Sequence, residues 1–435
     1  MHAVDSSHER PRVVMLLENF WYPQDVRVRD EAESLAAAGY AVEVIAPRAP
    51  GQPVAERVGA VNVRRFRVVG SQTLGVTGFL FEYLVALPAL HLHALRALFG
   101  GARVLHLHNP PDLLFPAGAV YRLAGRRVVF DHHDLFPEMV RVKTASPRLE
   151  AAARVAERLT YAVADHVLAT NESYAEIART RGKKHAHQVT IVRNAPPDSW
   201  LERAPGPRLN ATDDGSLRLA YLGELSDHDG VDALVRLLVL IRKRGLDPHL
   251  TVIGEGDARP GLERAVRIEG IADRVTFTGW IDHDAVPEIL ERVDICVDPA
   301  PATEYNVRST MTKIAEYLCV GQPIVAYDLA ETRRTAGGAA ILVAPGNEAA
   351  FADAVVSLGC DPERRRHYSA LARRRARSLS WCHSERALLD AYRRMIPATQ
   401  APAPCRTWRF QAAADEREDE PVALDGTGSN GARRA

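Results

Sequence analysis

The sequence predicts an α/β protein with two domains, each built around a doubly wound parallel sheet. The chain has 435 residues, which is more than one hydrophobic core usually serves. Short β-branched runs alternate with longer helical patterns, as expected of βαβ units. This alternation stops once, in a stretch rich in proline, glycine and polar residues, and then starts again. We therefore expect two domains that face each other across a ligand cleft at the carboxyl edges of their sheets.

The predicted strands fall into two groups of five. Those of the first half are expected at 12–17, 41–46, 103–108, 127–132 and 189–194. Those of the second half are expected at 217–223, 249–254, 274–279, 294–299 and 323–328. Each run is short, apolar and rich in β-branched residues, and such runs are typical of buried parallel strands.

The domain boundaries follow from the position of the interruption. The first domain is expected to span residues 11–200 and the second residues 217–380, with a linker at 201–216. Residues 381–397 contain an amphipathic helical pattern. Residues 398–435 are rich in alanine, proline, glycine and acidic residues, and we expect a disordered tail there because little of this stretch can be buried.

The most apolar stretch, residues 79–99, is interrupted by charged residues, histidines and a proline, so it does not fit a membrane-spanning helix. The favoured interpretation is a partly buried helix, and contact with a membrane surface is the alternative. Four leucines are expected to face the core: Leu84, Leu87, Leu90 and Leu95.

Composition excludes some functions. Lys and Arg together number 55, as do Asp and Glu, so a basic face for nucleic acid is not indicated. The five cysteines lack CxxC spacing, which argues against a zinc site and favours a reducing cytoplasm.

The most informative segment for function is NVRSTMTKIAEYLCVGQPIVAYD, residues 306–328. Ser309 and Thr310 are residue types that cap helices, and a helix N-terminus facing a cleft binds anions. Arg308 and Lys313 flank this end and could bind phosphate. Glu316 lies further along the helix, where its carboxylate could accept hydrogen bonds from a ribose diol. The alternative for Glu316 is an exposed helix residue paired with a nearby arginine.

This segment resembles the donor-binding motif of family 4 glycosyltransferases, most closely a subset with the pattern N-x-x-S-T-M-x-K-x-x-E-Y. The resemblance extends to about Met395. It also covers DVRVRDEAESLAAAGYAVEVIAP, VVFDHHDLFPEM, YLGELSDHDGVDALV, VIGEGD and RVTFTGWID. It implies the GT-B fold, in which two Rossmann-like domains face a cleft and a C-terminal helix crosses back to the first domain.

The resemblance also implies an activity, which is transfer of a hexosyl-type sugar from a UDP- or GDP-sugar with retention of configuration. The acceptor would be a glycan, a lipid-linked molecule or a small molecule, as in polysaccharide biosynthesis. The enzyme would be cytoplasmic, or peripheral on the inner face of the cell membrane. A sugar-nucleotide-binding module with weak catalysis and a UDP-sugar epimerase are the alternatives.

Donor-site roles follow from the aligned positions. Glu316 would bind the ribose, while Ser309, Thr310 and Met311 would hold the diphosphate, with Gly223 also on the donor side.

Three departures from the family pattern bear on the diphosphate. Glu224 and Asp229 stand where many members have an Arg and a Lys, and Arg308 stands at the first glutamate of the E-x7-E pattern. The glycine pair after the first strand is replaced by NFWYP. We therefore expect Arg308, Lys313 and the helix end to neutralise the diphosphate, with no metal or other cofactor.

Histidines and aspartates gather at the ends of two strands in the first domain, in HLHNPPD at 106–112 and DHHD at 131–134. His106 and His108 share a strand face, so this HxH could ligate a metal as in amidohydrolase-type enzymes, or could be structural.

The resemblance implies that His133, rather than His132, lies beside the reacting sugar, and that Asp134 or Asp112 orients the acceptor. His108 is placed on the acceptor side with them. Asp25 and Arg27 are expected to line the same side, with surface pairing between Arg27 and Glu31 as the alternative.

Overall fold

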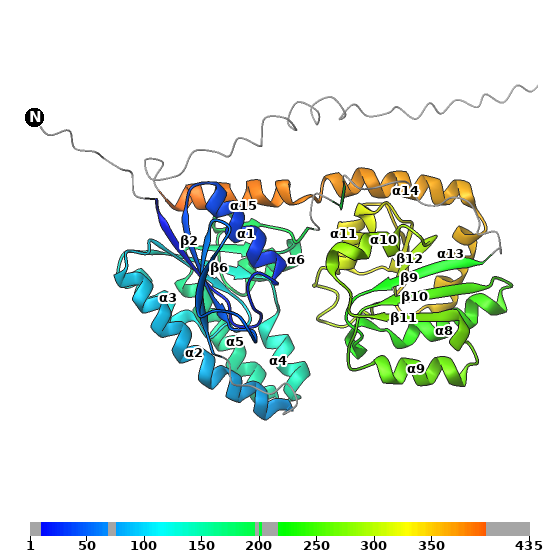
Figure 1. Cartoon of the computed structure of the whole chain (residues 1–435), viewed down its shortest axis with the longest axis horizontal. Helices are drawn as coiled ribbons and strands as arrows, with labels where there is room; N and C mark the ends of the chain where they lie inside the picture. Colours follow the sequence, from blue (N-terminus) through cyan, green and yellow to red (C-terminus); the bar gives the residue numbers. More distant parts are fainter. Residues whose placement is uncertain (1–9, 68–74, 196–199, 202–215, 397–435) are drawn as a thin grey trace, which may run out of the picture.

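The structure is a computed structural model that describes residues 10–67, 75–195, 200–201 and 216–396. It contains two α/β domains side by side (Figure 1). Most of the linker expected at 201–216, and the whole tail expected at 398–435, lie outside the described residues.

The first domain has an eight-stranded sheet in the order β3-β4-β2-β1-β5-β6-β7-β8. All neighbouring strands are parallel except the edge pair β3–β4, which is antiparallel. The strands are β1 Arg12–Leu16, β2 Ala41–Pro47, β3 Ala55–Val58, β4 Val61–Phe66, β5 Val104–His108, β6 Arg127–His132, β7 His166–Ala169 and β8 Val189–Ile191. The five predicted strands are all present, and β3, β4 and β7 are additional.

Six α-helices of this domain cover the two faces of the sheet. They are α1 Val26–Ala37, α2 Gly75–Phe99, α3 Phe115–Leu123, α4 Phe136–Thr144, α5 Pro147–Val163 and α6 Glu172–Thr180. Asp25 begins α1 by accepting a hydrogen bond from the Val28 backbone N–H at 3.0 Å. This cap places Asp25 at the carboxyl edge of the sheet, where β1 ends.

Helix α2 contains the predicted helix at 79–99, but its buried face differs from the predicted one. Leu90 is buried as expected, Leu87 and Leu95 are half-buried, and Leu84 is 69% exposed. The buried face consists mainly of small residues together with Tyr83 and Leu90, because small side chains allow α2 to pack closely on the sheet. Within the described residues, neither α2 nor another helix has the length and apolarity needed to cross a bilayer.

The second domain has a six-stranded parallel sheet in the order β11-β10-β9-β12-β13-β14. The strands are β9 Leu217–Leu222, β10 Pro248–Ile253, β11 Val275–Gly279, β12 Ile295–Asp298, β13 Ile324–Tyr327 and β14 Ile341–Val343. Its helices are α8 Asp232–Lys243, α9 Arg259–Ile268, α10 Val286–Leu290, α11 Thr312–Cys319, α12 Ala330–Ala336, α13 Glu348–Gly359 and α14 Pro362–Arg377. The five predicted strands are again present, and the short edge strand β14 is additional.

The last described helix, α15 Trp381–Met395, crosses back to the first domain and lies beside α1 (Figure 1). Leu388 and Tyr392 are fully buried in the same cluster as Val13 and Val28. The predicted crossing helix is therefore confirmed.

The chain passes from the first domain to the second earlier than predicted. Trp200 was expected in the first domain, but it packs in the core of the second domain with Met311 and Ile314. The indole of Trp200 is large and apolar, so its burial there fixes where the chain enters the second domain.

Candidate active site between the two domains

A cavity of about 320 Å³ lies between the domains and is lined by five of the predicted site residues, Asp25, Arg27, His133, Asp134 and Glu316. The first domain contributes Asn19, Asp25, Val26, Arg27, Asp30, His133, Asp134, Asn194 and Ala195. The second domain contributes His283, Thr312, Ala315 and Glu316, and Trp381 comes from the crossing helix. A larger hollow of about 630 Å³ between α8 and α9 contains none of the predicted residues, so it is a poor candidate for the active site.

His133 is held against the cavity by Asp131. The Nδ1 atom of His133 lies 2.8 Å from Oδ2 of Asp131, and the His133 backbone N–H donates to Asn109 at 2.9 Å. Because a carboxylate only accepts, Nδ1 carries the proton, which leaves Nε2 on the opposite side of the ring. Burial disfavours the charged imidazole, but the charge of Asp131 and its hydrogen bond outweigh this and raise the pKa of His133.

Arg27 keeps Asp131 ionised. Its guanidinium donates to both carboxylate oxygens of Asp131, at 2.8 and 2.5 Å, and also to Asn194 at 2.7 Å. Burial would raise the pKa of Asp131, but Arg27 and His133 hold it well below its usual range. The pairing of Arg27 with Glu31, which was the alternative to a place in the cleft, exists at 3.1 Å, but it is buried rather than on the surface. Arg27 therefore lines the cavity and organises its wall.

Asp134 connects the two domains. Its Oδ1 accepts a hydrogen bond from the Tyr305 hydroxyl of the second domain at 3.1 Å, and its backbone N–H donates to Asn109. Burial raises the pKa of the Asp134 carboxyl. An acceptor hydroxyl could replace Tyr305 as the donor to Asp134.

His108 and Asp112 lie deeper than expected. Both are fully buried and neither lines the cavity. His108 contacts Asp131 at 3.0 Å, and Asp112 accepts from the Asn109 side chain at 3.1 Å. These positions do not allow the direct acceptor contact that was expected of them, because neither side chain reaches the cavity. They support the residues that do line the cavity.

His132 does not line the cavity and has a structural position. It is fully buried, its Nδ1 lies 2.9 Å from the Tyr161 hydroxyl, and its ring stacks on Tyr174. Burial lowers the pKa of His132 to about 3.

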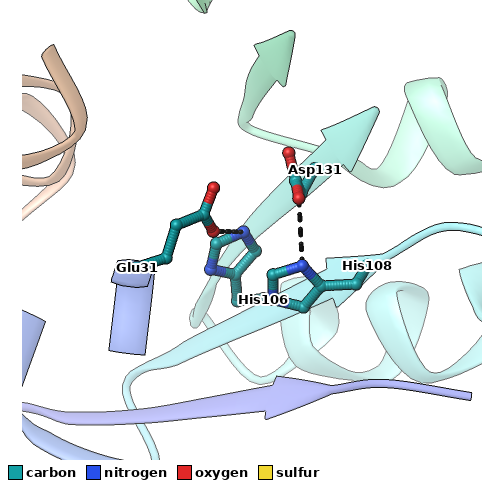
Figure 2. Close-up of side chains that lie close together, drawn as sticks. All are labelled: Glu31, His106, His108 and Asp131. Carbon is teal, nitrogen blue, oxygen red and sulfur yellow. Dashed lines mark hydrogen bonds and ion pairs between the residues drawn. The ribbon is translucent and has the colours of Figure 1, made fainter. Parts of the chain in front are cut away.

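Four buried side chains form a compact polar cluster beneath this wall: Glu31, His106, His108 and Asp131 (Figure 2). One potential ligand atom from each lies within 4.8 Å of the others, so their geometry could accommodate a metal ion. The carboxylates already have another cation, because the Arg27 guanidinium contacts both Glu31 and Asp131. In addition, Oδ2 of Asp131 accepts from His108 as well as Arg27. The cluster therefore fits a buried ion-paired support, with Arg27 as its cation, better than a metal centre.

Helix α11 begins later than the capping residues predicted. Its N-cap is Met311, which makes no side-chain capping bond and packs in the domain core. Ser309 and Thr310 instead bond the first domain, to the Tyr174 hydroxyl at 3.0 Å and the Asn171 side chain at 2.9 Å. The capping role was therefore wrong. The first turn of α11 has no side-chain cap and points toward the cavity through Thr312, so its backbone N–H groups could bind an anion.

Lys313 is engaged inside the second domain. Its Nζ donates to the Tyr221 hydroxyl at 2.9 Å and lies 3.5 Å from one oxygen each of Asp229 and Asp298. Burial would lower the pKa of Lys313, but Asp298, Tyr221 and Asp229 raise it overall. Gly223 packs directly against this side chain: at its φ of +146°, a Cβ would lie 3.0 Å from Lys313 Cε. Diphosphate binding by Lys313 would require these bonds to exchange.

Arg308 is more accessible than Lys313. Its guanidinium pairs with Glu304 at 2.9 Å, and 40% of its side chain is exposed. An exposed pair of this kind contributes little stability, so a phosphate could take the place of Glu304.

Glu316 faces the cavity and has one partner that the sequence did not reveal. Its Oε1 accepts from Nε2 of His283 at 2.9 Å. His283 follows β11 at the carboxyl edge of the sheet, where α/β proteins place ligand-binding side chains. The position of His283 after a predicted strand was the sequence signal that could have identified it as a site residue.

The two facing parallel sheets, the crossing helix and a cavity lined from both sides define the GT-B class, as predicted. The solved structure of Anabaena Alr3699/HepE in complex with UDP has the same fold. Its TM-score is 0.66 at 14% identity, over 88% of this chain and 99% of that one.

Two family models then match consecutive parts of the chain. Residues 24–195 match the glycosyl transferase 4-like domain, and residues 216–361 match glycosyl transferases group 1. The chain is therefore a GT-B protein composed of two glycosyl transferase domains.

Curated relatives carry related names. Alpha-D-kanosaminyltransferase from Streptomyces kanamyceticus is 31% identical over 147 residues, which are 33% of this chain and 37% of the relative. D-inositol 3-phosphate glycosyltransferase from Salinispora tropica is 27% identical over 405 residues, 85% of this chain and 80% of the relative. The first three curated relatives are each matched over less than half of their own length.

Proposed function

We propose that this protein transfers a hexosyl-type sugar from a nucleotide diphosphate sugar to a hydroxyl group of an acceptor. The observation that carries the proposal is the cavity that sets His133 and Asp134 of the first domain opposite Glu316 of the second. The two glycosyl transferase domains and the names of the relatives support the same activity.

The proposed donor is a UDP- or GDP-sugar. Glu316 binds the ribose, and the uncapped start of α11 binds the diphosphate. The Anabaena protein of the same fold was also solved with UDP-glucose, which supports a sugar nucleotide as the ligand class. His133 contacts a hydroxyl group of the donor sugar through Nε2, and Asp134 or Asp25 orients the acceptor.

The chemical requirement is stabilisation of the negative charge that develops on the leaving diphosphate. Fixed backbone dipoles at α11 supply it without reorganising the site. Arg308, which lies outside the cavity lining, adds its charge once a phosphate replaces Glu304 as its partner. In this proposal protein groups carry out the stabilisation, so no metal ion is needed and a chelator leaves transfer unchanged. The acceptor attacks from the face that the diphosphate leaves, which retains the configuration.

The proposed acceptor is a glycan, a lipid-linked molecule or a small molecule, as in polysaccharide biosynthesis, and the proposed compartment is the cytoplasm.

Replacing Glu316 with alanine tests the proposal. We expect Glu316→Ala to lower transfer and donor hydrolysis from UDP- or GDP-sugars by about tenfold or more, because a hydrogen bond to a charged group is lost. Glu263→Ala, at a partly exposed position on α9 paired with Arg259, is the matched control. Activity of Glu316→Ala equal to that of the control would exclude the site.

A second candidate function is a sugar-nucleotide-binding module with weak catalysis. It is favoured by the engagement of Lys313 with Asp229 and Asp298, and of Arg308 with Glu304. Calorimetry with UDP and GDP, combined with a donor hydrolysis assay, separates the two candidates. Nucleotide binding without turnover of any donor supports the module.

A further inference from the structure

The partner of Glu316, His283, has no role in the activity proposed so far. It lines the same cavity, although it lies 33 residues before Glu316 in the chain, after β11 rather than on α11. Its Nε2 lies 2.9 Å from Oε1 of Glu316. A carboxylate oxygen has no proton to donate, so the proton in this bond belongs to the imidazole.

This bond gives the two carboxylate oxygens of Glu316 different partners. Oε1 is occupied by His283, and only 15% of the Glu316 side chain is exposed. A glutamate has three side-chain torsions, and an unrestrained one loses their freedom when it binds a ligand. With Oε1 fixed, the carboxylate is already oriented before a ribose hydroxyl donates to it.

The imidazole is itself fixed by Trp200. The two rings stack with centroids 4.6 Å apart and planes 29° apart, and Trp200 is buried in the core of the second domain. Trp200 thus blocks one face of the His283 ring, while 38% of the His283 side chain is exposed. The stack restricts the ring so that Nε2 keeps its direction toward Glu316.

We propose that His283, backed by Trp200, is a positioning residue that orients Glu316 for the ribose diol of the donor nucleotide. This inference rests on the proposed function, since it assumes that Glu316 binds ribose. It assigns to His283 an effect on affinity for the ribose part of the donor and none on the base or the phosphates. Trp200 is therefore part of this ribose site through its stack on His283.

Calorimetry on the full chain tests the proposal with UDP, GDP and their 2′,3′-dideoxy analogues. His283→Phe keeps an aromatic ring for the stack and removes the donor, and we expect it to weaken binding of the ribonucleotide about tenfold. The dideoxy analogue, which has no diol to present, should bind wild type and His283→Phe equally. His283→Gln retains an N–H donor and should keep affinity within about threefold of wild type.

His249→Phe is the matched control. His249 lies near the start of β10, at the edge of the sheet away from the cavity, and bonds Thr276 at 3.0 Å. We expect this variant to bind both nucleotides like wild type. Thermal melting of each variant establishes that it is folded.

The outcomes separate this inference from the proposed function. The positioning role would be overturned if folded His283→Phe lost affinity for the ribonucleotide and for its dideoxy analogue equally, or lost none. The proposed function would still stand in that case if Glu316→Ala weakened binding of the ribonucleotide. Failure of His283→Gln to restore affinity would also count against it. Wild type that binds neither UDP nor GDP, or Glu316→Ala that binds both normally, would overturn the proposed function and this inference together.

Discussion

At the scale of single residues, Asp131 organises the first-domain wall because three side chains converge on its carboxylate. Arg27, His108 and His133 all contact it within 3.0 Å. Only His133 among the three is both held by Asp131 through Nδ1 and placed in the cavity with its second ring nitrogen available. Its protonation therefore depends on a fully buried carboxylate whose own charge is fixed by Arg27.

The raised pKa of His133 predicts a pH dependence of stability. A histidine whose pKa is higher in the folded state stabilises the protein fully below its unfolded pKa of about 6.5. This contribution is lost as the pH rises through the folded pKa, by up to about 1.4 kcal/mol per pH unit for one proton. We therefore expect His133→Gln to flatten the decline of the unfolding free energy above pH 6.5, measured by urea unfolding.

His166 provides the control for this measurement. It is a buried histidine in the same domain, and burial lowers its pKa to about 4. A lowered pKa affects stability only below the unfolded value, so His166→Gln should keep the wild-type slope above pH 6.5. Equal slopes for His133→Gln and wild type would show that Asp131 does not hold a proton on His133.

Several site residues could be predicted from the sequence because they occupy strand ends and a helix start. His133, Asp134, Asp25 and Glu316 lie in the cavity for this reason. The depth of His108 and the pairing of His283 could not be predicted, because they depend on how neighbouring elements cover a strand end.

At the scale of elements, ten strands were predicted and β3, β4, β7 and β14 were missed. In β4, buried Val61 and Val63 alternate with exposed Asn62 and Arg64, a pattern without a continuous apolar run. The strands β7 and β14, which are four and three residues long, were also missed, although β8, β12 and β13 are equally short and were predicted. The start of α11 was misplaced because Ser309 and Thr310 bond across the domain interface rather than within their own helix.

Lys313 ties α11 to strands β9 and β12, and a prediction follows from its burial. Lys313→Met leaves Asp298 buried without its cation, so we expect the unfolding free energy to fall by about 3 kcal/mol or more. Urea unfolding measures this loss. Adding Asp298→Asn to the same chain removes the uncompensated charge and should recover part of it.

Lys243→Met, at an exposed lysine on α8, is the control and should change stability by about 0.5 kcal/mol or less. If Lys313→Met is as stable as this control, the lysine is not structural. Lys313 could then leave Asp298 and Asp229 and bind phosphate without loss of stability.

At the scale of the whole molecule, the two domains meet through the residues just before α11. Tyr305, Ser309 and Thr310 of the second domain bond Asp134, Tyr174 and Asn171 of the first. The crossing helix α15 adds Trp381 to the cavity and buries Tyr392 in the first-domain core. A ligand in the cavity therefore contacts surfaces that both domains and the crossing helix hold in place.

This arrangement predicts that the sugar part of the donor contacts the first domain, whereas the nucleotide alone does not. UDP or GDP should slow hydrogen exchange at the start of α11 and in the segment around His283, because the ribose and diphosphate bind there. The matching sugar nucleotide should extend this protection to the segment around His133 and Asp134, because only the sugar reaches across the cavity. Hydrogen exchange followed by mass spectrometry distinguishes the two patterns.

In Glu316→Ala, the protection at the start of α11 and the protection around His133 should weaken together. Protection confined to the second domain with the sugar nucleotide bound would show that His133 does not contact the sugar.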